Sequence, residues 1–128
     1  MSYYISKIVD ASFDDTVQAV IKSLGEQGFG ILTDIDVQGT LKKKLDIDFR
    51  KYRILGACNP RFAYKALEVE DKIGVMLPCS VIVQERSDGK IEVAAMDPAA
   101  AMESIGNRAL VKIAHDVRDR LDAALNDL

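Results

Sequence analysis

The sequence predicts an α+β domain with a largely antiparallel sheet and helices packed on one face of it. Three observations carry this prediction. Several predicted strands have one wet face, which is typical of antiparallel sheets. The dipeptide Asp88-Gly89 lies between two strand-like segments and suits the tight turn of a hairpin. Other segments repeat apolar residues at helical spacing, so they supply a layer that covers one face of the sheet.

Five strands are expected from alternating or β-branched segments. In the second of them, Ile31, Thr33, Ile35 and Val37 face one way and Asp34 and Asp36 face the other, so one face is wet. In the third, the small residue Gly56 predicts that another group approaches the strand closely. The predicted strands are residues 3–9, 29–37, 52–58, 81–85 and 91–95.

Capping signals place the helices. Ser12 with two following aspartates starts a helix over residues 13–27, and Gly28 stops it. A short helix is expected over residues 39–45. Asn59 caps a helix over 60–70 that begins with Pro60, and its buried stripe is Phe62, Ala63, Ala66 and Leu67. The pair Asp97-Pro98 opens a short helical turn in the same way. The last helix carries its apolar stripe on Leu110, Ile113, Val117, Leu121 and Ala124.

Length and charge bound the class of protein. A chain of 128 residues is typical of a single domain with its own core. The net charge of −3, with 17 basic and 20 acidic residues interspersed, gives no basic stripe for nucleic acid. The run Lys42-Lys43-Lys44 is interpreted as the solvated side of a short helix. No signal peptide and no membrane span are recognised, so a cytoplasmic protein with no membrane association and with reduced thiols is expected.

The two cysteines frame the candidate site. Cys58 stands before Asn59 and Pro60, and Cys79 follows Leu77 and Pro78. The helix over residues 60–70 extends about 16 Å, and residues 71–78 can return about 25 Å. Such an excursion doubles back, which makes the next strand antiparallel and predicts that the two thiols share one end of the sheet.

Proximity leaves two interpretations of these thiols open. Cys58 precedes a helix N-terminus, which favours a reactive thiolate, whereas cysteine is also common as a small buried apolar residue. Glu85 and Asp97 are candidate acid–base groups, with a strand-end carboxylate and a helix cap as the alternatives. The single histidine, His115, falls opposite Val117 and is expected to be exposed, so no zinc site is predicted. Met76 and Met96 could join the cysteines toward a soft metal or haem, or serve as core residues.

The motifs resemble those of the domain of unknown function 302 family over essentially the whole chain. The segments that carry the resemblance are Ile54–Pro60, Ala63–Leu67, Ile73-Gly74, Leu77–Cys79, Glu85 and Asp97-Pro98. The resemblance implies a β-α-β(4)-α layout like that of the TATA-binding-protein fold class, and it implies self-association as a homodimer. It brings no established activity.

Two hypotheses for function follow. The favoured one is a non-enzymatic module that binds a small molecule or a protein near Cys58 and Cys79, without a cofactor, and that self-associates. The alternative is a thiol-dependent redox protein, or a soft-metal or haem-binding protein, that uses the same two cysteines. The candidate site comprises Cys58, Asn59, Pro60, Leu77, Pro78, Cys79, Glu85 and Asp97.

Overall fold

The computed structural model describes residues 2–128 and shows five strands in one antiparallel sheet, with helices on one of its faces. The spatial order of the strands is β1-β5-β4-β3-β2, and every neighbouring pair is antiparallel. This is the predicted α+β class with a layout that fits the TATA-binding-protein-like fold. The strands are β1 (Tyr4–Val9), β2 (Gly30–Asp36), β3 (Tyr52–Cys58), β4 (Cys79–Glu85) and β5 (Ile91–Met96).

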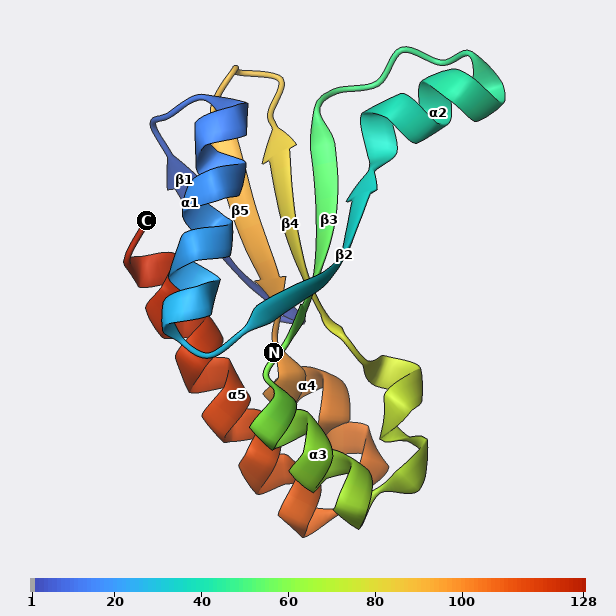
Figure 1. Ribbon diagram of the computed structural model, residues 1–128, viewed down its shortest axis with the longest axis vertical. Helices are drawn as coiled ribbons and strands as arrows, with labels where there is room; N and C mark the ends of the chain where they lie inside the picture. The colour runs from blue at the N-terminus through green and yellow to red at the C-terminus, as the bar shows by residue number, and fades with distance from the viewer. Residues whose placement is uncertain (1) are drawn as a thin grey trace.

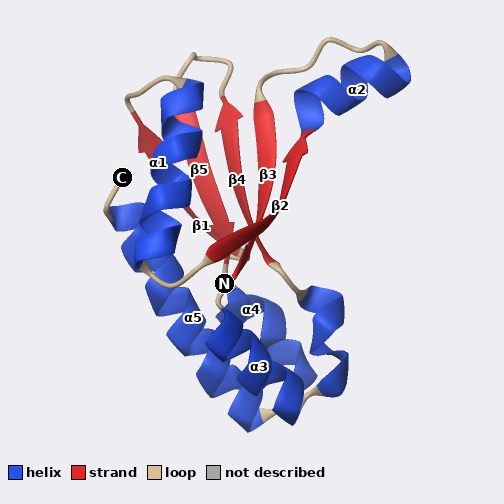
Figure 2. Cartoon of the chain, in the orientation of Figure 1, coloured by secondary structure: helices blue, strands red, loops and turns tan. Residues whose placement is uncertain are grey.

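The helices occupy three places around the sheet (Figures 1 and 2). The first helix and one half of the last cover one face, the middle helices gather beyond one end of the strands, and α2 projects from the opposite end. The helices are α1 (Phe13–Glu26), α2 (Val37–Leu45), α3 (Pro60–Val69), α4 (Pro98–Met102) and α5 (Arg108–Asn126), with the 3₁₀ segments η1 (Asp71–Met76) and η2 (Glu103–Ile105). No helix among residues 2–128 is long and apolar enough to cross a membrane.

Two apolar clusters form the core. The larger one lies between the covered face of the sheet and helices α1 and α5, and the smaller one lies among α3, η1, α4 and α5. Ser23 joins α1 to α5, because its hydroxyl donates a hydrogen bond to the carbonyl of Ala124 at 2.6 Å. The predicted stripe of α5 is confirmed, because Leu110, Val117 and Leu121 are buried. In α3, Ala66 is buried as predicted. The prediction that Leu67 is also buried is wrong, since 44% of Leu67 is exposed.

The predicted alternation of β2 is confirmed from Thr33 to Asp36, but it is wrong for Ile31, which lies on the opposite face from Thr33 and Ile35. The register shifts between Ile31 and Thr33, which leaves Leu32 as an extra residue without a partner. Such a bulge reverses which face the following residues occupy. Ile31 packs against the core, whereas Ile35 pairs with Ile54 on the opposite face and stays 47% exposed.

The start of α2 also differs from the prediction. The strand ends at Asp36, whose side chain accepts a hydrogen bond from the Gly39 N–H at 3.0 Å and caps the helix. The helix therefore begins at Val37, two residues earlier than expected, and ends at Leu45 as predicted; the residue that follows it, Asp46, adopts a left-handed φ of 53°. The lysines of α2 are exposed, which confirms their interpretation as a solvated side.

Candidate functional site

The candidate site lies where β3 ends and β4 begins. The chain leaves the sheet at Cys58, runs out along α3, returns through η1 and re-enters at Cys79. Strands β3 and β4 are antiparallel, and Ala57 lies directly opposite Cys79. The predicted doubling back is therefore confirmed, and both cysteines lie at one end of the sheet.

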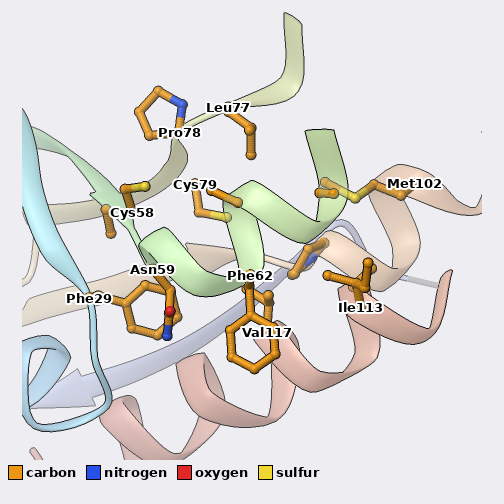
Figure 3. Close-up of a pocket in the computed structure, with 15 residues that line it drawn as sticks. Phe29, Cys58, Asn59, Phe62, Leu77, Pro78, Cys79, Met102, Ile113 and Val117 are labelled. Atoms are coloured by element: carbon orange, nitrogen blue, oxygen red, sulfur yellow. The ribbon is translucent and has the colours of Figure 1, made fainter. Parts of the chain in front are cut away.

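Both thiols line a small apolar cavity at this end (Figure 3), and neither is in a disulfide. Cys79 belongs to the larger core cluster and is only 6% exposed, whereas Cys58 is half-buried. Burial raises the pKa of the Cys79 thiol to about 11, and the nearby Cys58 adds to this rise. Cys79 therefore stays a neutral thiol at physiological pH, which disfavours it as a nucleophile.

Asn59 occupies the predicted N-cap position of α3, and Pro60 is its first residue. However, the Asn59 side chain makes no capping hydrogen bond, so that part of the prediction is wrong. Its Nδ2 instead donates to the carbonyl of Gln27 at 3.3 Å. Gly28 has a φ of +89°, and a Cβ on it would lie 3.0 Å from the same Nδ2. Asn59 thus joins the start of α3 to the turn that follows α1.

Leu77 and Pro78 close the other side of the site, and the peptide bond between them is cis. Leu77 packs against the smaller core cluster. Pro78 lies against Gly56, where an added Cβ would come within 2.8 Å of the proline Cγ and 2.2 Å of the Thr33 Oγ1. The close approach predicted at Gly56 is thereby confirmed, and the approaching groups are Thr33 and Pro78.

The cavity beside the cysteines has a volume of about 30 Å³. Its walls are almost entirely apolar and come from both core clusters. A water molecule needs roughly 10–15 Å³ on this measure, and sites for drug-sized ligands span roughly 300–1,000 Å³. The cavity is therefore the size of a small void in the packing and is too small to hold a metabolite.

Glu85 lies away from this site, whereas Asp97 lies at the same end of the sheet, directly before Pro98, which lines the cavity. Glu85 is the last residue of β4, six positions from Cys79, which corresponds to about 20 Å along a strand. Asp97 is buried and fully engaged in structure. Its carboxylate accepts hydrogen bonds from the N–H groups of Ala99 and Ala100, and it pairs with the Arg118 Nε at 3.0 Å. Of the two readings of Asp97, the helix cap is the one that the structure bears out.

The sulfur atoms do not converge on a metal site either. Met76 packs against the smaller cluster, and Met96 lines the open face of the sheet while also packing against the larger cluster. Met102, which sequence reasoning missed, lines the cavity together with both cysteines (Figure 3). His115 is exposed, as predicted. Within residues 2–128, no group of three or more His, Cys, Asp or Glu side chains is placed to hold a metal ion.

The uncovered face of the sheet carries a second concave region that sequence reasoning missed. Its volume is about 370 Å³, and tyrosines stand at both ends of a floor of small and aliphatic side chains. The signal that could have found it is the pairing of β4 with β5, which places Gln84 opposite Glu92 and Ile82 opposite Ala94. This region, called the open-face hollow below, is lined by Tyr3, Tyr4, Tyr52, Ser80, Ile82, Gln84, Glu92, Ala94, Ala95 and Met96.

Comparison with known proteins places the whole chain in one family. Residues 5–128 match the family model described as domain of unknown function DUF302. A similar solved structure is that of an uncharacterised conserved DUF302 protein from Bacillus stearothermophilus, which has 28% sequence identity, a TM-score of 0.92 and 98% coverage of each chain. No curated protein matches the sequence. The chain therefore belongs to the DUF302 family.

Proposed function

We propose that the protein is a non-enzymatic binding module that self-associates through a projecting arm. The arm consists of α2 and the segment 46–49, which project beyond one end of the sheet (Figure 1). The observation that carries the proposal is that α2 contains no buried residue. Its apolar residues Val37, Leu41 and Leu45 nevertheless recur every fourth position and so form one stripe.

The interactions within the arm are too few to keep helix α2 folded without a partner. A helix shorter than about 12–15 residues is marginal in water, and α2 has nine. Lys42 pairs with Asp46 and Asp48, but these pairs are exposed and contribute little. Gln38 Nε2 donates to the carbonyl of Phe49 at 3.0 Å and joins α2 to the returning segment. The apolar side chains of Leu45 and Ile47 nevertheless stay exposed. Packing against a partner would supply the missing stabilisation.

A second copy of the chain is the partner that we favour. Leu45 is 61% exposed and Ile47 is 47% exposed, so a two-fold contact between arms would bury both from each copy. The basic run 42–44 is followed closely by Asp46 and Asp48. In an antiparallel contact, the basic part of one arm would face the acidic part of the other. The resemblance to the family also implied self-association.

Strand pairing through the edge of β2 is a poorer route to association for this chain. The free edge of β2 carries a bulge at Leu32 and the charged residues Asp34 and Asp36, features that discourage pairing with another strand. Contact through arms alone covers a small area, and interfaces below about 1,200 Å² are typical of weak association. The dimer is therefore expected to form and dissociate with protein concentration.

Sedimentation velocity over a range of protein concentrations tests the proposal. The wild type should shift from monomer to dimer as concentration rises, and Leu45→Glu should remain monomeric. The matched control is Val75→Glu, because Val75 is 88% exposed on η1, away from the arm. A wild type that stays monomeric throughout, or a Leu45→Glu variant that associates as well as Val75→Glu does, would contradict the proposal.

The other earlier hypotheses receive less support. A small ligand beside the cysteines would need far more than the 30 Å³ present there. A mechanism in which Cys79 attacks would need its thiolate, whereas the raised pKa of Cys79 keeps this thiol protonated. Protein binding is accordingly the part of the favoured hypothesis that we retain.

A further inference from the structure

We propose that the open-face hollow binds an organic ammonium ion that carries an apolar body. This site is separate from the arm, and the proposal does not depend on self-association. The volume of about 370 Å³ falls within the range of small-molecule sites. From Glu92 to Met96 the hollow extends over four residues of β5, or about 13 Å.

The negative charge of the hollow favours a cationic ligand. Glu92 is the single charged residue among its lining side chains. Within residues 2–128, no lysine, arginine or histidine nitrogen lies within 4.0 Å of the Glu92 carboxylate. The side chain is half-buried near the hairpin end of β5, where a carboxylate gains from a cationic partner.

The carboxylate is held in place by a chain of hydrogen bonds. Gln84 Nε2 donates to Glu92 Oε1 at 2.8 Å, and Gln84 Oε1 accepts from Arg50 Nε at 2.9 Å. Both ends of the Gln84 amide are thereby fixed, which orients one carboxylate oxygen and leaves the other for a ligand. Arg50 itself is exposed, does not line the hollow, and lies over Phe49 and Tyr52 with its guanidinium carbon 4.4 Å and 5.4 Å from the ring centres.

The rest of the hollow suits an apolar body. Ala94 and Ile82 lie opposite each other in the floor, and Met96 lies opposite Tyr4. Tyr3 and Tyr4 pack edge to face, with ring centres 5.0 Å apart, and close the end away from Glu92. An ammonium group at Glu92 would therefore place an attached ring or chain over the alanine and isoleucine, toward the tyrosines.

Titration calorimetry with 2-phenylethylammonium tests the site on the intact protein. We expect saturable binding with a dissociation constant on the order of 1 mM or tighter. The anion 3-phenylpropionate, which has a similar ring and chain, should bind at least about tenfold more weakly. This comparison uses the wild type and does not depend on any variant folding correctly.

A pair of matched variants locates the binding. Glu92→Gln should weaken 2-phenylethylammonium binding at least about tenfold, because it removes a charge-assisted hydrogen bond. Glu85→Gln makes the same chemical change on β4 opposite Ile91, whose side chain is buried in the core, and should leave binding unchanged. The proposal is overturned by equal binding of the anion, by equal effects of the two substitutions, or by no saturable binding up to about 10 mM.

Discussion

The burial of Cys79 predicts a specific loss of stability in alkali. Its pKa is raised from 9.0 to about 11 in the native protein. Between these values the unfolded thiol ionises while the native thiol keeps its proton, so the unfolded state binds fewer protons and the free energy of unfolding falls as pH rises. The contribution of the neutral Cys79 thiol to the free energy of unfolding is fully present below about pH 9. One pKa unit corresponds to about 1.36 kcal/mol, so the loss reaches about 1.4 kcal/mol by pH 10 and approaches about 2.7 kcal/mol above pH 11.

Urea unfolding measures this pH-dependent loss of unfolding free energy. The wild type and Cys79→Ala are each unfolded at pH 8 and at pH 10, with a reductant present. Other groups titrate in this range as well, but they are common to both proteins and cancel in the difference between them. The stability advantage of the wild type over Cys79→Ala should shrink by about 1.4 kcal/mol between the two pH values. Cys58→Ala should retain most of this dependence, because the nearby Cys58 is only the second cause of the shift. An advantage that is the same at pH 8 and pH 10 would refute the reasoning.

Three further predictions concern the same end of the sheet. Gly56→Ala should lower the free energy of unfolding by about 1–3 kcal/mol, because its Cβ would collide with Thr33 and Pro78; Gly74→Ala, with nothing within 4 Å of the added Cβ, should be well tolerated in the same urea titration. Asp97→Ala should cost about 1–2 kcal/mol in thermal unfolding, and Asp97→Asn should recover part of this loss by restoring the cap; equal stability of the two variants would count against the cap. Iodoacetamide at neutral pH should label Cys58 first and Cys79 only after denaturation, as mass spectrometry of the peptides would show, and equal labelling of the native protein would contradict the burial of Cys79.

Much of the fold follows from local signals in the sequence. The bounds of β3 agree with the prediction, because the segment begins after polar residues and ends at the Asn59-Pro60 helix start. The direction of β4 could also be predicted, since the lengths of the two legs of the excursion decide whether the chain returns. These inferences succeed because each depends on residues close together in the chain.

The errors arise where distant residues decide the outcome. The bulge at Leu32 depends on how β2 matches β3, and no glycine or proline marks it. Asn59 was placed correctly at the helix start, but its hydrogen-bond partner, Gln27, lies 32 residues away. Glu85 was grouped with the cysteines although the length of its own strand already places it at the far end of the sheet.

The extra residue, Leu32, determines which face of the sheet each side chain in the second half of β2 occupies. If Leu32 instead paired with Gly56 in a regular ladder, residues 33–36 would move to the opposite faces of the sheet and Thr33 would turn away from Gly56 and Pro78. The bulge therefore has two effects: it places Thr33 against Gly56 beside the cysteines, and, because a bulge bends its strand, it changes the direction in which the chain runs toward α2. A relative with a regular second strand of the same length would place a different residue opposite the position of Gly56.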